Sequence, residues 1–179
     1  GSVLMEDVQR IAEVEGIQSY NITTATFAVN PYNFKRIEDS ENDQYNDQQA
    51  VTLRGNLNME KDKDVSNGNL KLKEGRWGNE KDSNVCVISE EIAQINNLSV
   101  GDKIQFNDYK DRENSNVYTA EIIGIYLNAK SIEALMPGDT YRGENMIFTD
   151  LGFPEKVNQT PGDPLYQYAT FYTESGQDY

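Results

Sequence analysis

Pairs of acidic side chains are the first residues whose types and spacing could support chemistry. Glu90 and Glu91 could supply the two carboxylates of a glycosidase. Neighbouring residues of a helix point about 100° apart, however, so the two side chains would not flank one scissile bond. We therefore expect both residues at the N-terminal end of a short helix, where the helix dipole favours acids, with Ser89 as the N-cap.

Two acid-rich stretches have the alternating spacing of a calcium-binding loop. They contain Asp62, Asp64 and Ser66 in one case and Asp39, Glu41 and Asp43 in the other. Neither stretch has glycine at the sixth position or glutamate at the twelfth, as an EF-hand requires. We therefore expect solvated loops at both places, and we assign no catalytic, cofactor-binding or metal-binding residue.

The cysteine and histidine content excludes most nucleophilic and zinc sites. The 179 residues include no His, so neither a Ser-His-Asp nor a Cys-His site can form within the chain. The one cysteine, Cys86, lies in an apolar run and is expected to be a small buried hydrophobe, with a reactive thiol as the alternative. Trp77 beside Arg76 is expected to be a packed aromatic with a stacked cation, with a sugar platform as the alternative.

The chain is strongly acidic, with 30 Asp and Glu against 16 Lys and Arg and a net charge of −14. Such a surface repels phosphate backbones and anionic lipids, which excludes nucleic acid as a partner. Residues 38–49 hold five acids and no base, and residues 58–69 form a second polar stretch. We expect the charge to belong to solvated loops, which makes a cationic peptide a conceivable partner.

The apolar periodicity predicts many strands and few short helices. Helices are expected over residues 4–14, 90–95 and 130–136. Strands are expected over residues 17–29, 50–57, 84–88, 117–127, 145–149 and 167–173 and in a segment that ends at Phe106, with a Pro- and Gly-rich loop over 152–164. This pattern favours an α+β fold with a mixed sheet.

Four short motifs follow one another across residues 70–127. They are LKEGR at 72–76, VCVISEEIA at 85–93, LSVGDKI at 98–104 and YTAEIIGIY at 118–126. In this order they resemble the extracytoplasmic core domain of MacB/FtsX-type ABC transporter permeases. A helix that ends at Gly16 and leads into a strand extends the resemblance toward the N-terminus.

The resemblance implies a porter-like, βαβ-containing core and a smaller variable subdomain. The implied division is a core over 3–127 with acidic loop insertions at 38–49 and 58–69, a variable subdomain over 128–149 and a return toward the core over 150–179, which we expect to be truncated. Gly1 and Ser2 are typical of the residues that a protease leaves when it removes a purification tag.

The resemblance also implies a non-enzymatic domain on the extracytoplasmic face of the bacterial cell membrane. In that family the domain relays conformational change that a cytoplasmic ATP-binding subunit drives through transmembrane parts, and in some members it contacts substrate or partner proteins. The full-length protein is expected to be dimeric. A cationic peptide or an envelope protein is the expected class of further partner, and no cofactor is expected.

Two alternatives remain open at this stage. A secreted or surface-anchored ligand-binding or adhesin module would use exposed aromatic residues. The C-terminal third is rich in aromatic residues that could serve this purpose if they are exposed: Tyr141, Tyr166, Tyr168, Phe171 and Tyr172. A closed barrel with an aromatic-lined sugar cleft would favour that module. A carboxylate-dependent hydrolase would need two buried carboxyls that face each other across a pocket.

Overall fold

The structure is a computed structural model that describes residues 19–38, 49–133, 142–158 and 166–172. The strands are β1 Ser19–Thr24, β2 Phe27–Pro31, β3 Val51–Asn56, β4 Lys71–Gly75, β5 Val85–Ser89, β6 Lys103–Asn107, β7 Tyr118–Leu127, β8 Met146–Asp150 and β9 Tyr166–Tyr172. The helices are α2 Lys63–Ser66, α3 Glu90–Asn96 and α4 Phe153–Asn158, with 3₁₀ turns η2 Met59–Lys61, η3 Ala129–Ser131 and η4 Gly143–Asn145. The expected mixed sheet with few short helices is confirmed.

Six of the strands form a closed ring. The hydrogen-bonded order is β2-β6-β7-β5-β8-β3, and β3 pairs again with β2, so the path returns to its start. The pairs β5–β7 and β3–β8 are parallel, whereas the other four pairs of the ring are antiparallel. A closed sheet leaves no unpaired edge within the ring itself.

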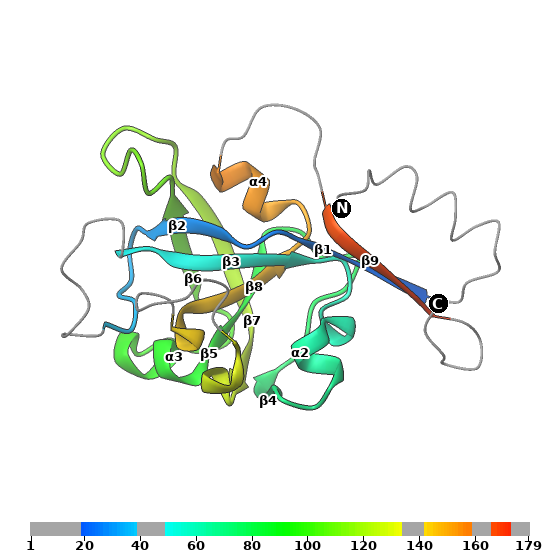
Figure 1. Cartoon of the computed structure of the whole chain (residues 1–179). Helices are drawn as coiled ribbons and strands as arrows, with labels where there is room; N and C mark the ends of the chain where they lie inside the picture. Colours follow the sequence, from blue (N-terminus) through cyan, green and yellow to red (C-terminus); the bar gives the residue numbers. More distant parts are fainter. Residues whose placement is uncertain (1–18, 39–48, 134–141, 159–165, 173–179) are drawn as a thin grey trace.

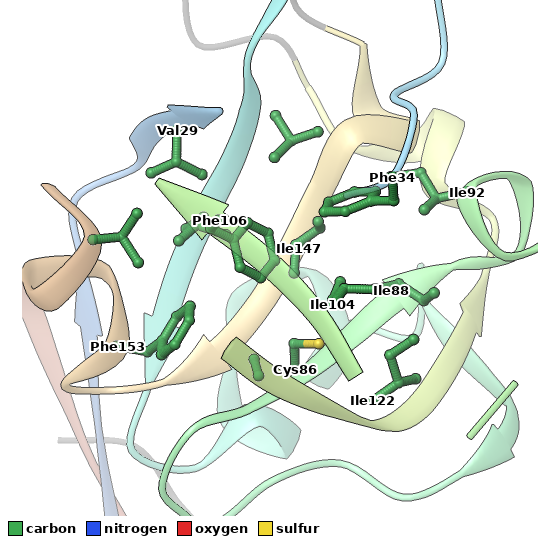
Figure 2. Packing of buried hydrophobic residues seen from close by; sticks show 14 of the residues in the cluster. Val29, Phe34, Cys86, Ile88, Ile92, Ile104, Phe106, Ile122, Ile147 and Phe153 are labelled. Carbon is green, nitrogen blue, oxygen red and sulfur yellow. The ribbon is translucent and has the colours of Figure 1, made fainter. Parts of the chain in front are cut away.

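The interior of the ring is a packed hydrophobic core (Figure 2). Side chains alternate between the two faces of a strand, so β5 sends Cys86 and Ile88 inward and Val85 and Val87 outward. The helices α3 and α4 cover opposite ends of the ring, through Ile92 on one and Phe153 on the other (Figure 1). The ring is therefore a filled core and encloses no channel among the described residues.

A second hydrophobic cluster lies on the outer face of β5, β7 and β8. Its members include Met59 and Leu70 from the segment 57–70 and Tyr126 and Phe148 from the ring. Trp77 packs over it, stacked on Tyr126 at 6.1 Å and edge-on to Phe148 at 5.8 Å between ring centroids. The segment that carries η2, α2 and β4 is thus held against the ring by apolar contacts.

The strands β1 and β9 form a two-stranded ribbon that leaves the ring on one side (Figure 1). They pair antiparallel from Ser19 opposite Tyr172 to Thr24 opposite Tyr166. Because the strands are antiparallel, the N-terminal end of β1 and the C-terminal end of β9 lie at the same end of the ribbon. Between the ribbon and the ring there is one ladder pair, Thr23 with Asn56.

Most predicted strands are confirmed, three predictions are wrong and one strand was missed. The strand expected over 17–29 is two strands, because the chain passes from the ribbon into the ring near Ala25. The polar stretch 58–69 contains η2 and α2, and the edge strand β4 was missed because most of its side chains are exposed. The loop expected over 152–164 contains α4, which buries Phe153 and Val157 four residues apart and begins next to Pro154.

Other predictions fall partly or wholly outside the described residues. The helix expected over 4–14 lies outside them, and of the helix expected over 130–136 only the start is described, where the chain forms η3. The division into a core, a variable subdomain and a return stays a prediction. Within that division, β8 lies in the ring between β5 and β3.

The close pairing of β4 with β7 depends on Gly124, which lies opposite Gly75. A Cβ atom on Gly124 would lie 2.5 Å from the backbone oxygen of Arg76, closer than packing allows. We expect Gly124→Ala to lower the free energy of unfolding by about 2–3 kcal/mol. Gly152→Ala is the matched control, because nothing lies within 4 Å of its added Cβ, and its effect should stay within about 0.5 kcal/mol. Urea unfolding followed by Trp77 fluorescence measures both, and equal losses would contradict the packing described.

Candidate functional site

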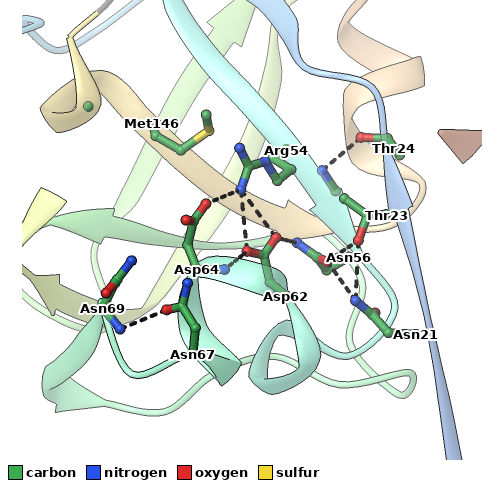
Figure 3. Close-up of polar contacts among 12 residues, drawn as sticks. Asn21, Thr23, Thr24, Arg54, Asn56, Asp62, Asp64, Asn67, Asn69 and Met146 are labelled. Atoms are coloured by element: carbon green, nitrogen blue, oxygen red, sulfur yellow. Dashed lines mark hydrogen bonds and ion pairs between the residues drawn. The ribbon is translucent and has the colours of Figure 1, made fainter. Parts of the chain in front are cut away.

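A buried group of polar side chains lies where the ribbon meets the ring, and we call it the polar joint (Figure 3). Its members are Asn21 and Thr23 of β1, Arg54 and Asn56 of β3, Asp64 of α2 and Asp62 just before that helix. The alternation of β3 explains its side of the joint, since Val51 and Leu53 face the core and Arg54 and Asn56 face outward. All six residues are nevertheless buried.

The ionic half of the joint is centred on Arg54. Its Nη1 lies 2.9 Å from Asp64 Oδ2 and 3.3 Å from Asp62 Oδ1, and its guanidinium carbon lies 5.7 Å from the ring centroid of Phe148. Asp62 Oδ1 also accepts the backbone N–H of Asp64 at 2.9 Å, which makes Asp62 the N-cap of α2. One guanidinium therefore faces two carboxylates away from water.

The amide half of the joint is centred on Asn56. Its Oδ1 accepts hydrogen bonds from Thr23 Oγ1 at 2.7 Å and from Asn21 Nδ2 at 2.9 Å. Its Nδ2 donates to Asp62 Oδ2 at 3.0 Å, so Asn56 connects β1 with the ionic half. The backbone N–H of Asn58 donates to Asn21 Oδ1 at 2.7 Å. These groups satisfy one another, so the joint supports attachment and offers no nucleophile or acid for catalysis.

The joint corrects the expectation that Asp62 and Asp64 belong to a solvated loop. Both are buried, and the cation beside them is the guanidinium of Arg54. The signal available in the sequence was Arg54, the one charged residue of its strand, because a buried charge requires a partner. Across the described ranges, no three His, Cys, Asp or Glu side chains gather as a metal site would require. The stretch with Asp39, Glu41 and Asp43 lies outside the described residues.

Cys86 lies inside the ring, as predicted for a small buried hydrophobe. Burial raises the pKa of its thiol far above the ordinary value, and the nearby carboxylates of Asp150 and Glu121 raise it further. The thiol is therefore kept protonated and away from solvent, and the alternative of a reactive thiol is wrong.

Glu90 and Glu91 begin α3, and Ser89 is its N-cap, as predicted. The Oγ of Ser89 accepts the N–H of Ile92 at 3.1 Å. Glu90 faces outward and pairs with Lys73 at 2.7 Å, whereas burial and the carboxylate of Glu144 raise the pKa of Glu91. The two carboxylates thus have different surroundings and do not form a catalytic pair.

A shallow open depression of about 310 Å³ lies between α3 and β4. Its lining is polar and aliphatic, and Glu74 and Glu90 contribute to it, whereas Glu91 and Glu144 do not. The two buried carboxyls across a pocket that a hydrolase needs are therefore not found at this depression. None of the residues that line the depression is aromatic. The depression is therefore not the aromatic-lined sugar cleft that an adhesin module would need.

Trp77 is a packed aromatic, as predicted, whereas the expected stacking of Arg76 on its ring gives way to an ion pair. The guanidinium of Arg76 instead makes a two-pronged pair with Asp82, at 2.7 and 2.9 Å. This pairing lowers the pKa of Asp82. The aromatic side chains proposed for an adhesin module, such as Tyr168, lie outside the described side chains.

The MacB-like periplasmic core domain family matches residues 2–174 of the chain. An uncharacterized ABC transporter permease of Bacillus subtilis (strain 168), YclI, is 27% identical over 152 residues, which cover 72% of this chain and 31% of that protein. The chain therefore spans less than a third of the length of this curated relative.

The fold also resembles a solved structure. The crystal structure of the extracellular domain of the noncanonic ABC-type transporter YknZ from Gram-positive bacteria matches with a TM-score of 0.53. The match covers 97% of this chain and 74% of that one at 15% sequence identity, so it concerns the fold alone. Within the described part of the chain, none of the helices is long and apolar enough to cross a membrane.

The ionic half of the joint generates a stability prediction. Arg54→Met leaves the carboxylates of Asp62 and Asp64 buried without their cation, so we expect a loss of about 3–5 kcal/mol in the free energy of unfolding. Lys73→Met is the control, because it removes an exposed ion pair, and it should unfold at nearly the wild-type urea concentration. Similar midpoints for the two variants would show that the buried pair contributes little.

Proposed function

Since this chain belongs to the MacB-like periplasmic core domain family, we propose that it is the non-catalytic extracytoplasmic domain of an ABC transporter permease. In this proposal the domain lies on the outer side of the bacterial cell membrane and relays conformational change. A cytoplasmic ATP-binding subunit drives that change through transmembrane segments of the full-length permease, which acts as a dimer. Substrate or partner proteins, with cationic peptides and envelope proteins as candidate classes, contact its polar outer surface.

The observation that supports this proposal is the pairing at one end of the ribbon. Ser19 and Tyr172 are direct partners, so the N-terminal end of β1 and the C-terminal end of β9 lie side by side. This geometry suits a domain inserted between two neighbouring membrane segments. The ribbon then receives any movement of the two segments together.

The closed strand pairing and the filled interior of the ring favour a mechanical role over a catalytic one. Its strands pair around a complete circuit, and its interior is filled by the hydrophobic core. Close-packed interiors have low compressibility and transmit strain. While the polar joint is closed, displacement of the ribbon would therefore move the ring as one body.

The proposed location can be tested by labelling intact cells. Asn114 is exposed in the hairpin between β6 and β7, whereas Cys86 is buried in the ring. In a full-length permease with no other cysteine, Asn114→Cys should react with a membrane-impermeant maleimide added outside, and the protein with Cys86 alone should react only after denaturation. Labelling of Asn114→Cys only after the cells are lysed would contradict the extracytoplasmic location.

The proposed relay can be tested by distances between two protomers. Full-length permease with Cys86→Ser and a spin label at Asn114→Cys is reconstituted with its ATP-binding subunit. We expect the distance distribution between the labels to shift by several ångströms between the nucleotide-free and vanadate-trapped states. An unchanged distribution in a preparation that still hydrolyses ATP would contradict the relay, and the lack of any dipolar signal would contradict the dimer.

A further inference from the structure

We infer that the ribbon is a detachable unit, which separates from the ring at the polar joint while the ring stays closed. This inference concerns the described domain alone, so it stands or falls independently of the proposed transport role. It follows from three properties of the contacts between β1 and the rest of the molecule: their number, their chemistry and the charge that they bury.

The ladder between the ribbon and the ring is very short. β1 pairs with β9 along its whole length, with a register shift between Thr23 and Thr24, but its ladder with β3 has the single pair Thr23 and Asn56. Beyond that pair, the backbone bond from Leu57 N–H to the Ile22 carbonyl, at 2.9 Å, continues the attachment. Each strand of the ring, by contrast, is paired on both sides.

The remaining attachment is polar. The hydroxyl of Thr24 accepts the N–H of Gly55 at 2.9 Å, and the Nδ2 of Asn58 donates to the Tyr20 carbonyl at 2.6 Å. Neither hydrophobic cluster of the described residues includes a side chain from β1, and Ile22, although buried, belongs to neither. Water can replace hydrogen bonds when β1 moves away, whereas opening the ring would expose an apolar core.

The charge of the joint also favours separation. Arg54 and its two carboxylate partners are ionisable groups that the closed joint keeps out of water. Asn56 lies between β1 and Asp62, because it accepts from Thr23 and donates to Asp62. When β1 leaves, water gains access to Asn56 and, through it, to the carboxylate of Asp62. This rehydration offsets part of the lost hydrogen bonding.

Local opening of this kind can be measured by native-state hydrogen exchange on the chain itself. The N–H groups of Gly55, Leu57 and Asn58 report on the joint, because each donates to β1. The N–H of Ile122, which donates to the Asp102 carbonyl, reports on the ring. We expect the three joint amides to open at least 100-fold more often than Ile122, with little dependence on urea. Equal opening with the urea dependence of global unfolding would overturn the inference.

Two variants sharpen the test. Asn56→Asp places a carboxylate where an amide N–H now meets Asp62, and Thr23→Val removes one donor with little change in shape. Each should increase opening at Leu57 and Asn58 at least 5-fold and leave Ile122 within 2-fold of wild type, while Asn114→Asp, in an exposed hairpin, should change none of them. If Asn56→Asp fails to fold, Thr23→Val alone decides. Parallel changes at the joint and ring amides would mean that the ribbon does not separate by itself.

Discussion

Closure of the sheet by the pairing of β2 with β3 is the constraint on which the rest of this structure depends. Once the ring is complete, the inward-facing side chains of six strands are committed to packing, and even Cys86 serves as a small apolar group. Because its interior is filled, the ring offers no internal site among the described residues. The attachments outside the ring are the segment with α2 and β4, the capping helices and the ribbon.

The attachments are held to the ring by different kinds of contact, and these contacts should make them differ in rigidity. The segment with η2 and α2 brings Met59 and Leu70 into an apolar cluster and also surrounds Arg54 with its two carboxylates. Its bulk is therefore fixed both by packing and by a buried ion pair. β1 joins the body through the polar joint, the buried Ile22 and a few backbone bonds. One domain thus combines an outer layer held by apolar packing with a strand, β1, whose described contacts are mostly polar.

The sequence predicted those parts of the fold whose apolar pattern is local. The strands around Val87, Ile122 and Ile147 and the helix capped by Ser89 have short-range signals, and the structure confirms them. Ring closure has no such signal, because it depends on pairings between segments far apart in the chain. The polar joint was missed for a related reason: Asp62 and Asp64 look like solvent-facing acids until Arg54 is placed beside them. The motifs across residues 70–127 indicated the family that the comparison confirms. These motifs lie on the ring strands β5, β6 and β7 and on β4 and α3, which pack against those strands.

The two strand ends formed by Ser19 and Tyr172 lie side by side, and this placement would set how the ribbon responds to load from the connections there. If both connections move in the same direction, the ladder between β1 and β9 carries no relative displacement, and the ribbon behaves as a short rod that pushes, pulls or twists the ring. If the connections move apart, the rungs of the ladder are loaded one at a time from the open end, and the two strands peel. Under the proposed relay, the ribbon would therefore transmit a concerted movement of its two ends to the ring more strongly than a separation of those ends.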